Sequence, residues 1–300
     1  MKNKVKQIIP SILAVLFAIC GVVAAGFLIH GLAQDKSTEN IQSELQKIKE
    51  AAQTTDSAEP EKTDDAEPDG AADATEPGGL DSAADSTESG MLPGYRELYE
   101  KNQDLIGWLS IDDTNIDYPV MQTMEDECYY LRRDFYGKKN RNGCLIMDTD
   151  SVVGTGTAAD GYADGTAPST NLIIHGHTMK SGEMFGKLPL YADETYGKEH
   201  NIIRFDSLYE EREYELIAVF YSQIFYTYED VFKYYNFFQA DTQEEFDDWY
   251  DNIKEMSLYD TGVTAEFGDE FITLSCCSYH VEDGRFVVVG RRINSPQYQE

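Results

Sequence analysis

The stretch from Thr54 to Gly90 sets the strongest limit on what this chain can fold into. It consists almost entirely of Ala, Asp, Glu, Pro, Thr, Ser and Gly, with almost no apolar side chains. Such a composition cannot bury enough surface to offset the entropy lost on ordering, so we expect the stretch to be disordered. The sequence that follows it, about two hundred residues, is long enough for one domain with a substantial core.

Acidic residues are concentrated in the same region. The chain has a formal net charge of −31, and residues 35–90 hold 16 acidic against 4 basic side chains. Nucleic-acid binding requires clustered Lys and Arg, so this balance argues against a nucleic-acid partner. We predict an acidic low-complexity linker over residues 35–90. A short helix is expected at its start, because Ile41, Leu45 and Ile48 have helical spacing.

An uncharged run from Ile8 to Leu32 precedes this linker. At 25 residues it exceeds the roughly 20 that cross a bilayer as a helix. The lysines before it, at positions 2, 4 and 6, should remain cytoplasmic. A cleaved signal peptide is the alternative, but the apolar run continues beyond the small residues at positions 24–26. Residues 1–34 are therefore predicted to be a cytoplasmic stub and a single transmembrane anchor at the cell membrane, with the domain that follows outside the cell.

Residues 91–300 have the pattern of a mostly β domain. Short apolar and β-branched runs are separated by Gly, Asn and Asp, at Ile106–Ile111, Ile116–Val120, Cys144–Met147, Leu172–Ile174, Ile202–Phe205, Tyr214–Phe225, Phe271–Ser275 and Phe286–Ile293. Eight short strands with irregular connections predict an eight-stranded β-barrel with short peripheral helices. Ser151–Thr170, which is rich in Gly, Ala, Asp and Thr, is predicted to be a long loop.

Two helices are also expected in this domain. Leu92–Gln103 has the pattern of a short amphipathic helix. Thr242 and Glu245 form a capping box for a second helix, whose apolar face is predicted to be core, with Phe246, Trp249, Tyr250, Ile253 and Met256.

Two strand ends carry side chains suited to catalysis. His177 follows an apolar strand that begins at Asn171, which gives a partly exposed ring suited to proton transfer near neutral pH. Cys276 and Cys277 end the strand that begins at Phe271. Successive strand residues point to opposite faces, so one thiol is expected to face inward and the other a cleft. Taken alone, each of these residues is more readily explained by a structural role.

A third segment adds a guanidinium. Asp283-Gly284 is a hairpin signal, so the strand that begins at Arg285 should run back beside the strand that ends at Cys277. Arg285 would then lie near the thiol, where it could donate hydrogen bonds to a developing oxyanion. The sequence alone also allows a surface ion pair for this arginine.

Together these segments resemble the three signatures of the sortase family. A Thr-Leu-x-x-Cys strand end carries the sortase nucleophile and occurs here at Thr273–Cys277. Gly176-His177 matches the histidine signature, and Arg285 opens the following strand. Residues 102–111, 117–122 and 184–188 are similar to class B sortases in particular, and the resemblance covers roughly residues 95–293.

The resemblance implies a cysteine transpeptidase of Gram-positive cell-wall assembly. Cys277 would attack the threonine carbonyl of a C-terminal sorting motif in a secreted protein and form a thioester. An amine would resolve the thioester, either on a lipid-linked peptidoglycan precursor or on a pilin lysine. His177 would protonate the leaving amine and later deprotonate the incoming one, while Arg285 would hold the substrate backbone and the oxyanion. The sequence shows no metal site, and this chemistry needs no cofactor.

One position departs from the family pattern. The residue before the nucleophile is ordinarily threonine in sortases, whereas here it is Cys276. The resemblance implies that Ser275 and Cys276 contact substrate, with a weaker contact from the thiol than from a hydroxyl. A disulfide between Cys128 and Cys144 is left open by the sequence.

Two other functions use the same residue types. A papain-like cysteine hydrolase would have a helix beginning at the nucleophile and an Asn or Asp orienting the histidine, whereas here the cysteine ends a predicted strand. A non-enzymatic surface protein could keep the barrel and only bind. The joint presence of cysteine, histidine and arginine at the three motif positions favours the transpeptidase.

Overall fold

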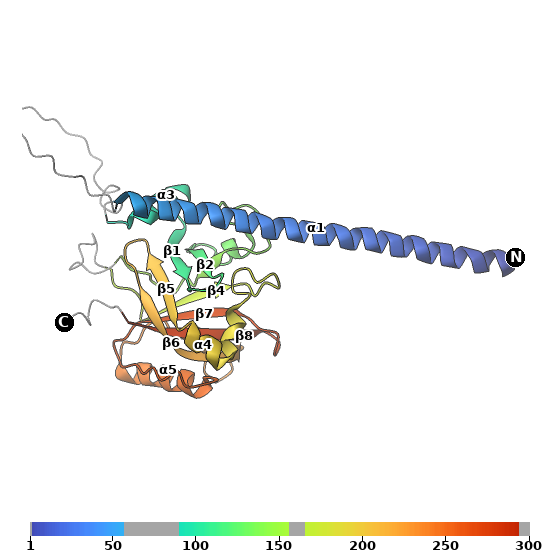
Figure 1. Cartoon of the computed structure of the whole chain (residues 1–300). Coiled ribbons are helices and arrows are strands. Elements are labelled where there is room, and N and C mark those ends of the chain that lie inside the picture. The colour runs from blue at the N-terminus through green and yellow to red at the C-terminus, as the bar shows by residue number, and fades with distance from the viewer. Residues whose placement is uncertain (1, 57–89, 156–165, 294–300) are drawn as a thin grey trace, which may run out of the picture.

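In a computed structural model of the chain, the described residues contain eight strands that form one closed barrel (Figure 1). The structure describes residues 2–56, 90–155 and 166–293, and within the first helix it describes the side chains of residues 20–51. The strands are β1 (Leu105–Ser110), β2 (Asp117–Met121), β3 (Leu145–Met147), β4 (Asn171–Gly176), β5 (Ile202–Ser207), β6 (Glu213–Gln223), β7 (Phe271–Cys277) and β8 (Gly284–Arg292). The predicted mostly β fold with short helices is confirmed, and every expected strand is found within a few residues of its predicted bounds.

The strand order is β1-β2-β3-β4-β7-β8-β6-β5, and β5 pairs with β1 to close the sheet. The β2–β3 and β4–β7 pairs are parallel and the others are antiparallel. The carboxyl ends of β4 and β7 therefore meet the amino-terminal end of β8. We call this rim of the barrel the β4–β7–β8 edge.

The interior of the barrel is an apolar core to which nearly every strand contributes. Alternate residues of a strand face the same side, so one set of side chains from each central strand lines this core. These are Leu172 and Ile174 of β4, Ile272, Leu274 and Cys276 of β7, and Phe286 and Val288 of β8. The other set faces outward, toward loops and helices.

Helix α5 (Gln243–Met256) covers part of the outer surface. The predicted capping box of Thr242 and Glu245 is present at its start. Its apolar face packs on outward side chains of β6, β7 and β8, with Phe246, Trp249 and Ile253 buried and Tyr250 and Met256 packed against them. The predicted core role of this face is confirmed.

The remaining helices are short, apart from the first. They are α3 (Pro93–Lys101) and α4 (Glu194–Glu199), with the 3₁₀ helices η1 (Tyr129–Arg132), η3 (Leu188–Ala192) and η4 (Tyr234–Asn236). The predicted helix over Leu92–Gln103 corresponds to α3. These segments fill the connections around the barrel and position several side chains of the site.

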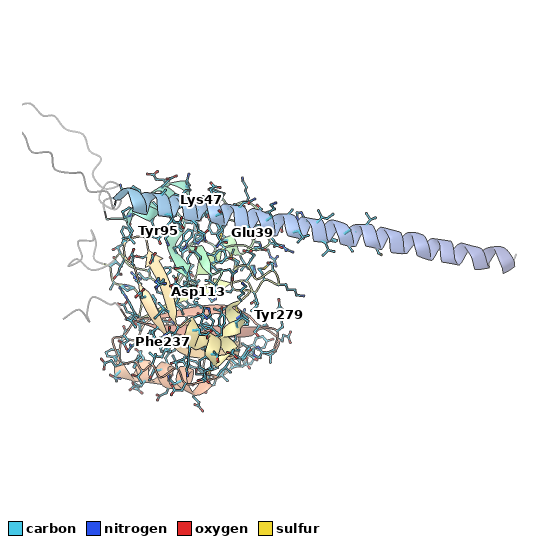
Figure 2. The ribbon with its side chains drawn as sticks, in the orientation of Figure 1. Glu39, Lys47, Tyr95, Asp113, Phe237 and Tyr279 are labelled. Carbon is cyan, nitrogen blue, oxygen red and sulfur yellow. The ribbon has the colours of Figure 1, made fainter. Side chains whose placement is uncertain are left out.

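Helix α1 (Lys2–Asp56) is a single continuous helix. Its carboxyl-terminal half, with Glu39 and Lys47, lies along the domain, and its amino-terminal half extends beyond it (Figure 2). The short helix expected at the start of the linker is present, but it is continuous with the preceding helix, without a break at the predicted boundary after residue 34. Residues 35–51 are docked helix, because Ile41, Leu45 and Ile48 pack into an apolar cluster with α3, β1 and β3.

Parts of the other predictions fall outside the described residues. These are residues 57–89 of the predicted linker and residues 156–165 of the predicted loop. Within the part of the chain that is described, no helix combines the length and apolar character of a bilayer crossing.

Candidate active site

Strand register brings the three predicted catalytic residues to one place. Gly176 of β4 lies opposite Cys276 of β7, and Cys277 lies opposite Arg285 of β8. His177 is the next residue after β4, so histidine, cysteine and arginine all stand at the β4–β7–β8 edge. Paired residues of neighbouring strands share a face, which places the side chains of Cys277 and Arg285 on the same side of the sheet.

The two adjacent cysteines face opposite sides of β7. Cys276 is 2% exposed and belongs to the interior core, whereas Cys277 is half-buried. Burial raises the pKa of the Cys276 thiol to about 12, so it stays protonated near neutral pH. Of the two sulfurs, that of Cys277 is the one on the outer face. The substrate contact expected for Cys276 does not fit this placement, because strand alternation turns its side chain into the barrel.

Ser275 lies on the outer face but is covered. It is 1% exposed, and its hydroxyl lies 2.7 Å from the hydroxyl of Tyr234 in η4. The expected substrate contact of Ser275 is therefore not available at the surface, since its hydroxyl already has a partner. Tyr234 was not identified from the sequence, because it lies in an irregular connection with no pattern that links it to β7.

His177 is held through one ring nitrogen. Its Nε2 lies 2.8 Å from the backbone carbonyl of Leu131. A carbonyl only accepts hydrogen bonds, so Nε2 carries the proton and Nδ1 of the neutral ring is left to accept one. Burial lowers the pKa of His177 below its ordinary value of 6.5. The ring is therefore neutral at neutral pH.

The backbone around His177 is packed tightly. A Cβ atom at Gly176 would lie 2.5 Å from Phe185 and 2.6 Å from Leu145. Only glycine therefore fits at this position of β4 without a shift of its neighbours. The hydroxyl of Thr178 donates to the carbonyl of Cys277 at 2.5 Å. This bond ties the segment after β4 directly to the end of β7 and fixes the two catalytic segments relative to each other.

Arg285 is half-buried at the start of β8. Its Nη1 donates to the carbonyls of Asp283 and Gly284, at 3.1 and 3.0 Å. Asp283 has a φ of 51°, in the left-handed region that turns of this kind require. The turn over residues 281–284 closes a six-residue connection, 278–283, which is longer than the two-residue hairpin that Asp283-Gly284 signals. It brings the guanidinium back beside the cysteine strand, where backbone carbonyls hold one of its nitrogens.

One group of side chains near His177 has the donors and spacing for a divalent cation. Glu127, Asp148 and His175 offer ligand atoms that all lie within 4.8 Å of one another. Asp148 and His175 also pair directly, at 3.2 Å. Burial, with a further contribution from Asp148, raises the pKa of Glu127. The direct pair satisfies His175 without an ion.

The five cysteines are free thiols. Cys128 is exposed and Cys144 is buried. The disulfide that the sequence left open between these two is not formed.

The lowered pKa of His177 predicts a specific titration. NMR of the imidazole resonances, assigned with a His177→Asn variant, should give a midpoint below 6.5. Folding favours the neutral ring, so His177 lowers the free energy of unfolding when the pH falls. Its contribution to stability is fully present above pH 6.5 and is lost as the pH falls through the folded-state pKa. A midpoint at or above 6.5 would contradict the buried environment described here.

Comparisons with known proteins place the chain in a family. No protein-family model matches it. Sortase B of Listeria monocytogenes is 30% identical over 217 residues, which cover 71% of this chain and 79% of the relative. The crystal structure of sortase B from B. anthracis in complex with AAEK2 is 30% identical, with a TM-score of 0.56 over 68% of this chain and 85% of that one. A crystal structure of Staphylococcus aureus sortase B, at 21% identity, is alike in fold, with a TM-score of 0.61 over 87% of this chain and 98% of that one.

The barrel and these relatives define the class of protein as cysteine transpeptidases. The Listeria relative is matched over most of both chains, and it identifies the family within this class. The chain belongs to the sortase family, class B.

Proposed function

We propose that the chain is a membrane-anchored class B sortase with Cys277 as nucleophile. It would cleave a C-terminal sorting motif of secreted proteins and transfer the acyl group to an amine. The observation that supports this proposal is the strand register, which gathers His177, Cys277 and Arg285 at the β4–β7–β8 edge. A histidine can take the proton of a cysteine nucleophile only when the two side chains lie close together.

The reaction follows from the roles of these three side chains. Nδ1 of His177 takes the thiol proton of Cys277, and the sulfur attacks the scissile carbonyl. Arg285 donates hydrogen bonds to the oxyanion that forms. His177 then gives its proton to the leaving amine as the peptide bond breaks and a thioester remains. The incoming amine attacks the thioester and passes a proton back through His177 to the departing sulfur, which restores the free thiol and yields a new amide.

The proposal places residues 1–34 in the cell membrane and the catalytic domain outside. Support comes from the exposed apolar side chains of α1 beyond the domain: Phe27 is 75% exposed, Leu28 69% and Ile29 67%. Successive exposed apolar side chains are typical of a surface that contacts a membrane or another protein, which supports a membrane segment here. Both acceptor classes implied by the family, lipid-linked peptidoglycan precursors and pilin lysines, would be met at that outer surface.

One assay separates this function from its alternatives. The full chain in detergent is incubated with a panel of sorting-motif peptides and an amine, either a peptidoglycan stem-peptide mimic or a lysine peptide. A sortase yields the amide-exchanged product, a papain-like hydrolase yields only the cleaved acid, and a binding protein yields no product. Exchange with one class of amine only would identify the acceptor.

A further inference from the structure

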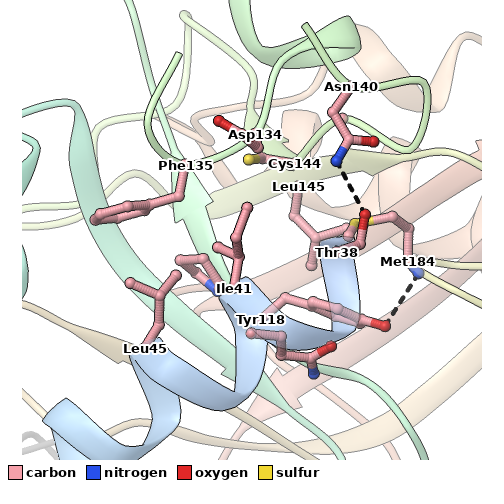
Figure 3. A pocket seen from close by; sticks show the side chains of 13 residues that line it. Thr38, Ile41, Leu45, Tyr118, Asp134, Phe135, Asn140, Cys144, Leu145 and Met184 are labelled. Atoms are coloured by element: carbon pink, nitrogen blue, oxygen red, sulfur yellow. Dashed lines mark hydrogen bonds between the residues drawn. The ribbon is translucent and has the colours of Figure 1, made fainter. Parts of the chain in front are cut away.

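Helix α1 contacts the segment that holds His177. Residues 129–144, which we call the buttress loop, contain Leu131, the residue whose carbonyl accepts from the His177 ring. Leu45 of α1 is 1% exposed and shares an apolar cluster with Tyr130, Phe135 and Cys144 of this loop. Figure 3 shows α1 side chains facing the loop across a small cavity of about 30 Å³. The loop is therefore packed between the helix and the site.

A buried hydroxyl of α1 makes the polar contact. Thr38 is 6% exposed, and its Oγ1 accepts from the Nδ2 of Asn140 at 3.0 Å (Figure 3) and from the Nδ2 of Asn142 at 3.1 Å. Asn140 and Asn142 are themselves 3% and 0% exposed. A buried amide that loses its acceptor raises the free energy of the folded state. This contact therefore favours the position of the loop in which the amides are satisfied.

A charged contact one turn earlier supports the same position. Asp35 pairs with Arg141 at 2.6 Å and accepts from the Nδ2 of Asn142 at 3.1 Å. Three successive loop residues, 140–142, are thus held by two residues of α1.

The buttress loop passes this restraint to Leu131. The amide of Asn140 donates to the carbonyl of Arg132 at 3.0 Å, and that of Cys144 donates to Tyr130 at 3.1 Å, so the bonds fall on both neighbours of Leu131. Gly143 has a φ of +62°, and a side chain there would meet the Leu131 carbonyl at 2.3 Å. The carbonyl is therefore fixed by the part of the loop that α1 holds.

We infer that Thr38 is a positioning residue for His177. The helix holds residues 140–142, these hold residues 130–132, and the Leu131 carbonyl keeps the proton on Nε2, so that Nδ1 serves the reaction. The inference rests on the proposed catalytic role of His177. It assigns α1 a part in catalysis in addition to attachment.

Three variants of the full chain test this positioning. Thr38→Val keeps the shape of the side chain but removes the hydroxyl that accepts from Asn140 and Asn142, while Asn142 keeps its bond to Asp35. Thr38→Ser restores the hydroxyl. Ser37→Val is the matched control, because Ser37 is the neighbouring residue of the same helix and is exposed. Each variant is assayed for amide exchange across pH, and the His177 ring is titrated by NMR.

The expected result is a loss confined to the variant without the hydroxyl. Thr38→Val should lower kcat/KM by roughly tenfold, since a small displacement of a catalytic group has effects of that size or larger. The pKa of His177 should rise toward 6.5 as the ring loses its buried setting, and the acid limb of the pH profile should move with it. Thr38→Ser and Ser37→Val should match the wild type in both measurements.

Two outcomes would overturn the inference. One is equal activity and equal His177 titration in Thr38→Val and Ser37→Val. The other is reduced activity in Thr38→Val with an unchanged His177 titration, which would indicate only a general loss of stability. If the wild type forms no amide with any peptide, the proposed function fails instead, and the NMR titration still decides whether Thr38 acts on His177.

Discussion

Replacement of Cys277 by alanine should reduce amide exchange by at least about 10³-fold, because the thioester cannot form without the sulfur. Product is measured by chromatography, and the acyl-enzyme by the mass of the intact protein after incubation with peptide alone. The wild type should gain the mass of the acyl group, and the variant should gain none. Persistent turnover by Cys277→Ala would refute the assignment of the nucleophile.

The adjacent thiol offers a matched control. Cys276→Thr changes the neighbouring residue on the same strand, but its side chain faces the interior core. Threonine is close to cysteine in size, so exchange should remain near the wild-type rate or exceed it. An inactive Cys276→Thr variant with wild-type thermal stability would show that this thiol takes part in the chemistry.

Replacement of Arg285 by alanine should lower kcat by roughly 10²-fold, the usual cost of losing one donor to an oxyanion. Arg285→Lys should recover only part of the activity, because an ammonium lacks the planar arrangement of donors. Exchange kinetics at saturating amine give kcat and KM separately. A change confined to KM would assign Arg285 to ground-state binding alone.

Arg291 provides the comparison for this arginine. It stands at the opposite end of β8, opposite Phe271, and donates to the carbonyl of Thr264 at 2.7 Å. Arg291→Ala removes the same charge from the same strand, far along it from Cys277. Its kcat should stay within a few-fold of the wild type, and an equal loss in both variants would indicate a charge effect instead of a local one.

Much of the barrel could be predicted because its strands carry local signals. Each is a short apolar run bounded by residues that favour turns, and the capping box of Thr242 and Glu245 marked the start of α5. The Asp283-Gly284 signal correctly indicated that β8 runs back beside β7, but the connection is a six-residue loop, 278–283, so this signal alone does not fix the pairing of Arg285 with Cys277. The pairing of β4 with β7 has no such local signal, and the family resemblance supplied that part of the prediction.

Other features of the site could not be predicted because they depend on tertiary contacts. The partner of His177 is a backbone carbonyl, which every residue possesses, so nothing in the sequence distinguishes Leu131. The hydroxyl partner of Ser275 comes from Tyr234, which is distant in sequence. The docked half of α1 was predicted to be a short helix at the start of a linker, but its packing on the domain was not predicted, because its polar residues were counted with the acidic stretch that follows. One of them, Thr38, is buried against the loop.

The parallel pairing of β4 and β7 also bears on how such a protein can diversify. The spacing between imidazole and thiol is set by hydrogen bonds between two adjacent strands, and not by the length of the chain from Thr178 to Glu270 that joins them. That connection, which carries β5, β6 and α5, can lengthen, shorten or exchange surface loops while the reactive pair keeps its distance. New recognition surfaces can therefore arise on this scaffold without rebuilding its chemistry.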